Sequence, residues 1–400
     1  MTGTFDRTYV RTHPWITFQA DLRQAPPALW MLLGEAASKS EHIAGVPLQP
    51  DVAQRLHQLY LAKGVLATTA IEGNTLSQEQ VERHLEGKLE LPPSKQYLAR
   101  EIENIVRACN QIGEEVIARG AIELTPEQIK RFNAQVLSGL AMEEGGVAGE
   151  YRAHAVGVAR YRGAPAEDCE YLVERLCRWI NGPEFQPVGD SALAVAVLKA
   201  VIMHLYIAWI HPFGDGNGRT ARLVEFQLLV SAGVPTPAAH LLSNHYNETR
   251  TEYYRRLDEA SRSGGDVIPF ILYAVQGFVD ELRSQLELVK RQQLKIAWEH
   301  YVHKMLPVRT SSEGRRLRLV LDLSDQAEPV PKSQIPRMSA RVAELYAKKT
   351  TKTLTRDVNA LLDMKLLRKE AGGYVSNRES ILAFLPARAK PSDPGGGAAT

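Results

Sequence analysis

Residues 210–222 read IHPFGDGNGRTAR and bring a histidine, a carboxylate, three glycines and two arginines close together. Gly216, Asn217 and Gly218 come directly before a strongly helical run, so their backbone N–H groups lie at a predicted helix N-terminus. Free amides and the helix dipole favour negative charge there. Glycines also let the backbone approach a phosphate closely. The pattern therefore predicts a phosphate cradle.

The side chains around this cradle suggest a reaction. Arg219 and Arg222 are three residues apart and share a helix face, from which they can reach successive phosphates. Asp215 is placed to hold Mg²⁺, and His211 can accept a proton from an attacking hydroxyl. Each feature alone is more often a turn, a cap or a solvated face. Their combination indicates a single reaction centre.

The stretch HPFGDGNGRTAR at 211–222 matches the H-x-F-x-[DE]-G-N-G-R-x-x-R signature of the Fic family, and the resemblance runs from about residue 30 to about residue 288. It implies an all-α fold with a Fic-type helical core and a β-hairpin flap. The implied activity is transfer of AMP from Mg-ATP to a Ser, Thr or Tyr hydroxyl of a target protein, or of the chain itself, with release of pyrophosphate. Transfer of another nucleotide or of phosphocholine, and removal of AMP, remain open.

The same resemblance implies roles for individual residues. His211 would be the general base and Asp215 the Mg²⁺ ligand. The 216–218 amides with Arg219 would hold the α- and β-phosphates, and Arg222 the γ-phosphate. Ser261 stands where many relatives have an asparagine at adenine, which leaves nucleotide choice open. The positions implied to contact ATP are Glu72, Val158, Ala159, Arg160, Tyr161, Asp215, Gly216, Asn217, Gly218, Arg219, Thr220, Ala221, Arg222, Tyr253 and Tyr254.

A second stretch, TTAIEGN at 68–74, resembles the [ST]-x-x-x-E-[GN] inhibitory motif of many Fic proteins. Thr68, Glu72 and Gly73 occupy its defined positions. The resemblance implies that Glu72 projects into the site and pairs with Arg222, so that ATP binds in an unproductive pose. Without the 211–222 match, the same pattern would describe only a helix end.

Three further features have a structural and a functional interpretation. The alternating stretch at 149–165 predicts a hairpin that is either a target-binding flap or a plain structural element. Tyr253 and Tyr254 match the tyrosine pair that Fic proteins use around adenine, although one or both could be core residues. His204 shares a helical face with His211, and we expect a buried histidine there rather than a second base.

Composition is ordinary for a globular protein, with 44% hydrophobic and 24% charged residues and a net charge of +2. Cys109, Cys169 and Cys177 are too scattered for a disulfide framework or a zinc site, which favours a reducing cytoplasm. The N-terminus does not resemble a signal peptide. Residues 191–210 are apolar but contain a lysine and a histidine, so we expect a buried helix and no membrane partner.

Hydrophobic periodicity and the helix-breaking residues between periodic segments divide the chain into four parts. They are an N-terminal helical region with the inhibitory helix (1–110), a Fic core (111–305), a winged-helix domain (314–388) and a disordered tail (389–400). Helices are predicted at 50–69, 77–85, 99–117, from 125 onward, and at 168–180, 191–210, 216–232, 247–261, 267–305, 316–323, 339–348 and 353–364.

The C-terminal part resembles the winged helix-turn-helix domain appended to some Fic proteins, with a recognition helix in 350–368 and a wing at 369–376. Residues 304–400 carry a net charge of about +8 and residues 1–303 about −6. Lys348, Lys349, Lys352 and Arg356 are expected on the exposed face. The sequence leaves both DNA and protein as partners of this domain, and it leaves a homodimer open. A second hypothesis is therefore a nucleotide-sensing, DNA-binding regulator with little or no transferase activity.

Overall fold

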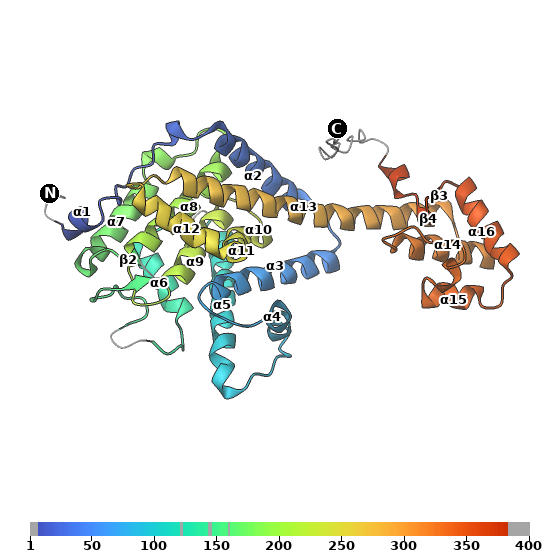
Figure 1. The fold of residues 1–400 in the computed structure, drawn as a ribbon, viewed down its shortest axis with the longest axis horizontal. Coiled ribbons are helices and arrows are strands. Elements are labelled where there is room, and N and C mark those ends of the chain that lie inside the picture. Colours follow the sequence, from blue (N-terminus) through green and yellow to red (C-terminus); the bar gives the residue numbers. More distant parts are fainter. Residues whose placement is uncertain (1–6, 121–122, 143–145, 159–160, 383–400) are drawn as a thin grey trace, which may run out of the picture. The chain divides into compact units, whose positions relative to one another are not determined.

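The computed structural model describes residues 7–120, 123–142, 146–158 and 161–382, and Figure 1 shows a mostly helical chain. Contacts divide it into two compact units, Met1–Glu287 and Leu288–Thr400. The expected all-α fold class is confirmed. Ala159 and Arg160, two of the predicted ATP contacts, lie outside the described residues.

The first half of unit 1 contains six α-helices. They are α1 (Thr8–Thr12), α2 (Pro27–Gly45), α3 (Pro50–Ala70), α4 (Gln78–Leu85), α5 (Gln96–Arg119) and α6 (Pro126–Val136). Local signals explain several starts: Pro50 and Pro126 occupy first-turn positions, and Ser77 forms a capping box with Gln80. Helix α2 is not among the predicted helices.

The second half of unit 1 begins with a small antiparallel hairpin, β1 (Gly157–Val158) with β2 (Tyr161–Arg162). The predicted hairpin is thus present, although most of residues 149–165 is irregular. The helices that follow are α7 (Cys169–Ile180), α8 (Ala192–Ile210), α9 (Asn217–Ser231), α10 (Thr236–Ala239), α11 (Leu241–Glu248), α12 (Arg250–Arg262) and α13 (Ile268–Met305).

Helices α8 and α9 pack against each other in the middle of unit 1 (Figure 1). α8 is apolar and long enough to cross a membrane, but 78% of its most hydrophobic window is buried inside the protein. Most of α9 is buried too, including Arg219 and Arg222. The motif between the two helices is therefore anchored in the core of unit 1.

One predicted boundary is wrong. The helix predicted over 247–261 corresponds to α12, which starts at Arg250, whereas α11 at Leu241–Glu248 is not among the predicted helices. Thr249 separates them with φ −110° and ψ 36°, and its hydroxyl donates to the His245 carbonyl at 2.7 Å. The Thr249 amide donates to the same carbonyl at 3.0 Å, so the break lies in the backbone angles of Thr249 and not in a lost hydrogen bond.

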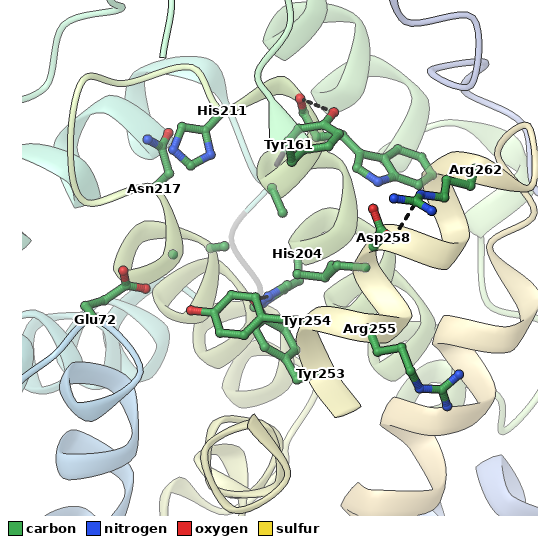
Figure 2. A pocket seen from close by; sticks show the side chains of 15 residues that line it. Glu72, Tyr161, His204, His211, Asn217, Tyr253, Tyr254, Arg255, Asp258 and Arg262 are labelled. Carbon is green, nitrogen blue, oxygen red and sulfur yellow. Dashed lines mark hydrogen bonds and ion pairs between the residues drawn. The ribbon is translucent and has the colours of Figure 1, made fainter. Parts of the chain in front are cut away.

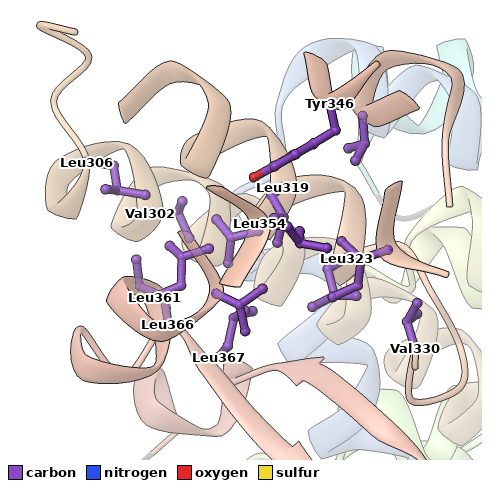
Figure 3. Packing of buried hydrophobic residues seen from close by; sticks show 14 of the residues in the cluster. Val302, Leu306, Leu319, Leu323, Val330, Tyr346, Leu354, Leu361, Leu366 and Leu367 are labelled. Carbon is purple, nitrogen blue, oxygen red and sulfur yellow. The ribbon is translucent and has the colours of Figure 1, made fainter. Parts of the chain in front are cut away.

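Unit 2 contains the C-terminal part of α13, then α14 (Ser311–Ser324), α15 (Ala340–Tyr346), α16 (Thr351–Asp363) and the antiparallel pair β3 (Leu367–Glu370) and β4 (Gly373–Ser376). Figure 3 shows its own apolar core, which includes Val302, Leu319, Leu354 and Leu361. Helix α13 thus contributes residues to both units. Short 3₁₀ helices lie at Leu22–Gln24, Pro93–Lys95, Ala166–Asp168, Pro183–Phe185, Ile335–Arg337 and Arg378–Ile381.

Candidate active site

A cavity of about 580 Å³ opens in unit 1 beside the 211–222 motif (Figure 2). Its wall comes from four places in the sequence: the end of α3, strand β2, the α8–α9 junction and helix α12. The lining residues are Glu72, Tyr161, His204, Ala208, Trp209, His211, Asn217, Gly218, Ala221, Tyr253, Tyr254, Arg255, Leu257, Asp258 and Arg262. Predicted base, cradle, inhibitory residue and adenine tyrosines thus face one cavity.

The loop between α8 and α9 is fixed by its own side chains. His211 ends α8 in the left-handed region, with φ 50° and ψ 59°. The Asn217 side chain closes the loop by accepting from the Phe213 amide at 2.9 Å and donating to the Phe213 carbonyl at 2.8 Å. Phe213 itself is buried and packs against Tyr151. Asn217 therefore positions the loop through its side chain, which leaves only its backbone amide for the cradle.

Arg152 holds the same loop from the flap side. It is buried, and its guanidinium donates to the carbonyls of His211 at 2.7 Å, His154 at 2.7 Å and Ala164. Its amide also donates to the Pro212 carbonyl at 3.0 Å. One side chain therefore ties the backbone of His211 to the segment that leads into the hairpin.

His211 is suited to accept a proton. Its burial and the nearby Arg152 guanidinium lower the pKa of His211 to about 4. Glu72 and Asp215 oppose this shift but are smaller influences. The imidazole is consequently neutral at pH 7, which is the state that a general base requires.

The cradle is shaped by Gly216, the N-cap of α9, which has φ 74°. A Cβ at this position would lie 3.1 Å from Asn133 Nδ2 and 3.2 Å from Val136 Cγ2. A larger residue is therefore disfavoured both by the positive φ angle and by these tight contacts. The same Asn133 nitrogen donates to the Asp215 carbonyl at 2.9 Å and to the Thr220 hydroxyl at 3.3 Å. Thr220 is buried there and does not line the cavity.

Arg219 lies between two carboxylates. Its Nη1 is 3.0 Å from Glu101 Oε1 and its Nη2 is 3.1 Å from Asp215 Oδ1. Glu101 also accepts from the side-chain amide of Asn74 at 2.8 Å. Asn74 belongs to the 68–74 motif, so this motif is linked to Arg219 through Glu101. Glu72 of the same motif contacts Arg222 directly.

Glu72 contacts Arg222 as the sequence predicts. The distance from Arg222 Nη2 to Glu72 Oε1 is 2.6 Å, and the same nitrogen donates to the Thr68 carbonyl at 2.9 Å. A methyl group at Gly218 would collide with this Glu72 oxygen, so the carboxylate lies directly over the cradle. α3 ends at Ala70, and Gly73, with φ 103°, turns the chain away directly after Glu72.

The charges of this pair are mutually stabilised. Burial opposes ionisation of Glu72, but the Arg222 charge and hydrogen bond, with Arg219 and His211, lower the pKa of Glu72 overall. Arg222 is almost fully buried, and within the described part of the chain its Nε and Nη1 have no hydrogen-bond partner. Nη1 would lie 3.1 Å from a Cβ at Gly218, so an unpaired N–H donor is beside the cradle.

Part of the chain matches a known protein family, and a larger part matches known proteins. Residues 123–229 match the model of the Fic/DOC family. This segment of the chain resembles a Fic domain. Protein adenylyltransferase fic-1 of Caenorhabditis elegans is 31% identical over 216 residues, which cover 53% of this chain and 38% of the relative. Protein adenylyltransferase Fic of Drosophila ananassae is 28% identical over 239 residues, covering 59% and 44%. The chain thus spans less than half the length of these relatives.

Solved structures agree on the fold. A Fic family protein from Desulfovibrio desulfuricans G20 superposes with a TM-score of 0.55 at 19% identity, covering 92% of this chain and 97% of the other. A segment of Fic-1 from Caenorhabditis elegans gives a TM-score of 0.50 at 23% identity, covering 64% and 71%. The first of these likenesses extends over nearly the whole chain.

Tyr253 and Tyr254 are adjacent in sequence but lie in two different environments. Tyr253 is buried, and its hydroxyl is 2.8 Å from His204 Nε2, while His204 Nδ1 lies 3.1 Å from Glu225 Oε2. Tyr254 is 39% exposed and extends into the cavity (Figure 2). His204 is thus a buried, partnered residue, as expected, and Tyr254 is the more available of the two rings.

In the hairpin of the Fic domain, Val158 pairs with Tyr161, and the Tyr161 hydroxyl donates to the Trp209 carbonyl at 2.8 Å. This bond attaches β2 to α8 at the edge of the cavity (Figure 2). Of the four flap positions predicted to contact ATP, Tyr161 is the one whose side chain the structure places at the site.

Several residues of the site were not predicted. Asp258 and Arg262 follow the predicted Tyr254 at spacings of four on α12 and share its cavity face, and they pair with each other at 3.0 Å. Helical periodicity could have revealed that face. Ser261, by contrast, is buried, donates to the Asp258 carbonyl and does not line the cavity. The roles of Glu101 and Arg152 depend on contacts across 118 and 59 positions, which no local pattern indicates.

Proposed function

We propose that this Fic domain protein transfers AMP from ATP to a hydroxyl group of a protein, and that Glu72 inhibits the reaction. The observation that carries the proposal is the position of a neutral His211 on the same cavity as Asn217 and Gly218 at the N-terminus of α9. The curated relatives, each named a protein adenylyltransferase, support the transferase class.

ATP would lie with its phosphates over the N-terminus of α9. The first amides of a helix have no acceptor within the helix, and Gly218 has no side chain that would hold a phosphate away once the Glu72 carboxylate withdraws. Arg219 would contact the α- and β-phosphates, and Arg222 would contact the γ-phosphate through its unpaired Nη1. Adenine would enter the apolar part of the cavity beside Tyr254 and Leu257.

The donor set also fits Mg²⁺. Asp215 Oδ1 is engaged with Arg219 and the Gly216 amide, while its side chain remains 46% exposed toward solvent. Mg²⁺ is usually bound by one or two carboxylates together with substrate phosphates and water. The described residues contain no group of three histidine, cysteine, aspartate or glutamate side chains that could hold a metal ion. The remaining Mg²⁺ ligands would therefore come from the phosphates of ATP. Asp215 would hold the ion, which would neutralise phosphate charge.

The chemical step is an in-line displacement. The acceptor hydroxyl would attack the α-phosphorus while His211 takes its proton. The new O–P bond forms as the bond to the β-phosphate oxygen breaks, and pyrophosphate leaves. Most of the rate acceleration would come from positioning and charge neutralisation, as in phosphoryl transfer generally.

Inhibition would follow from the position of the Glu72 carboxylate. It occupies the space above Gly218 and neutralises Arg222, so it opposes the γ-phosphate both sterically and electrostatically. ATP would then bind with its α-phosphorus out of line with the attacking hydroxyl. Activity would then be controlled by one ion pair, Glu72–Arg222.

The test uses α-labelled ATP and the purified full chain, alone and with a cell lysate. We expect protein labelling by the Glu72→Gly variant, none by Glu72→Gly/His211→Asn, and equal ATP binding by both variants in calorimetry. Labelled GTP, CTP, UTP and CDP-choline are compared in parallel. ATP binding without labelling of any protein would contradict the transferase and favour a nucleotide-sensing regulator.

A further inference from the structure

Unit 2 has the architecture of a helix-turn-helix with a wing. α15 and α16 are joined by residues 347–350, and the β3–β4 hairpin follows α16 directly. Leu354, Val358 and Leu361 bury one face of α16 against α14 and the rest of the core. In helix-turn-helix proteins the second helix enters the DNA major groove. The opposite face of α16 is the one that would meet DNA.

That face is basic and polar. Lys352, Arg356 and Asn359 are exposed at helical spacing, and Lys348 and Lys349 are exposed in the preceding turn. In the part of the chain that the structure describes, none of these four cations forms an ion pair. Lysine and arginine contact phosphate, while asparagine and arginine also read base edges.

Three arginines of α14 are used internally. Arg315 and Arg316 pair with the buried Asp357 at 2.7 and 2.9 Å, and Arg318 pairs with Asp322 at 2.7 Å. The carboxylates are thereby neutralised inside the unit, while the cations around α16 keep their full charge. The exposed carboxylates nearest in sequence are Glu344 on α15 and Asp363 at the far end of α16.

The N-terminus of α16 is open as well. Its first turn contains no acidic residue, and Thr350 makes no side-chain capping bond. The neighbouring helices differ, because Thr310 caps α14 and Ser339 caps α15. Unpaired first-turn amides and the helix dipole favour an anion at this end, beside Lys349 and Lys352.

The wing continues the positive surface. Lys365, at the end of α16, and Lys369, in β3, are both exposed. Gly372, with φ 97°, makes the tight turn between β3 and β4. A two-stranded wing with an exposed lysine can contact the backbone next to the groove that a helix occupies.

From this arrangement we propose that unit 2 binds double-stranded DNA, with α16 in the major groove and the 348–349 turn and the wing on phosphates. This function is separate from AMP transfer and does not depend on it. A protein partner is the competing occupant, but an apolar centre is typical of such interfaces, and the exposed face of α16 is charged and polar.

The experiment measures fluorescence anisotropy of a labelled 20-bp duplex with the full-length chain between 50 and 200 mM salt. We expect affinity to fall steeply as salt rises, because each protein–phosphate contact releases a counterion. Lys352→Gln/Arg356→Gln should weaken binding at least about tenfold at 50 mM salt and reduce the log–log slope by about 2. Lys348→Gln/Lys349→Gln provides an independent second variant.

The matched control is Lys95→Gln/Arg119→Gln, which removes two exposed charges from unit 1. It should bind DNA like the wild type, and all variants should keep the wild-type melting temperature and adenylylation activity. Absence of duplex binding at 50 mM salt would overturn the proposal. So would equal weakening by the control variant, or binding of single-stranded DNA as tight as that of the duplex.

Discussion

Oε1 of Glu72 lies 2.6 Å from Nη2 of Arg222, across 150 positions of sequence. The same arginine nitrogen donates to the Thr68 carbonyl, one turn earlier on α3. Arg222 therefore binds both a side chain and a backbone carbonyl of the 68–74 segment. Nη1 of this almost fully buried arginine has no hydrogen-bond partner among the described residues, whereas a ligand that recruits Nη2 must replace Glu72 or Thr68.

Removing the carboxylate should activate the enzyme and destabilise its free form. Glu72→Gly frees the space over Gly218 and the Arg222 charge, and we expect at least about tenfold more labelling from α-labelled ATP. Breaking a fully buried pair costs about 3–5 kcal/mol, and the 31% exposure of the Glu72 side chain reduces this to about 1–3 kcal/mol.

Thermal unfolding with and without ATP measures the second effect. Saturating ATP should restore more stability to Glu72→Gly than it adds to the wild type. Glu72→Gln keeps the size of the side chain and removes its charge, so its activity should fall between those of the other two proteins. Equal labelling by all three would show that Glu72 does not control the reaction.

The overlap between Gly218 and Glu72 can be tested by a double-mutant cycle. Gly218→Ala should cost about 1–3 kcal/mol in the wild type, since its methyl group collides with Glu72 Oε1. In the Glu72→Gly background the same change should be neutral or stabilising, because alanine is the better helix former. Urea denaturation of the four proteins gives the coupling energy. An equal cost in both backgrounds would contradict the contact.

Arg152 should position the base rather than bind substrate. Arg152→Gln removes donors to the carbonyls of His211, His154 and Ala164, so it should lower the unfolding free energy by about 2–4 kcal/mol. Displacement of His211 should reduce kcat by about 10–100-fold in the Glu72→Gly background with little change in KM for ATP. The exposed Arg55→Gln on α3 is the control and should leave both quantities unchanged.

The depressed pKa of His211 predicts an acid-side loss of stability. Its pKa is about 4 in the folded chain against 6.5 when unperturbed, so the unfolded chain binds the proton more tightly. The contribution is complete above about pH 6.5 and is lost as pH falls toward 4. At pH 5 the loss is about 2 kcal/mol. The urea midpoint of the wild type should therefore fall more between pH 7.5 and pH 5 than that of His211→Asn. The variant lacks this titration, and asparagine tolerates the left-handed backbone.

Local patterns predict much of the fold and the centre of the site. The 211–222 spacing places His211 at the end of one helix and the cradle at the start of the next, because caps, glycines and periodicity act over a few residues. The same kind of pattern predicts the order of unit 2. It misses α2, α10 and α11, and it starts α12 three residues early, because the break at Thr249 is not encoded in hydrophobic spacing.

The sequence by itself determined which chemical groups stand beside one another along the chain: the base, the carboxylate, the cradle amides and the two arginines. Only the tertiary structure decided which groups these arginines contact. Glu101 reaches Arg219 from α5 and Glu72 reaches Arg222 from α3, across 118 and 150 positions. The physical reason is that ion pairs depend on distance in space, and the packing of α3 and α5 against α9 sets those distances.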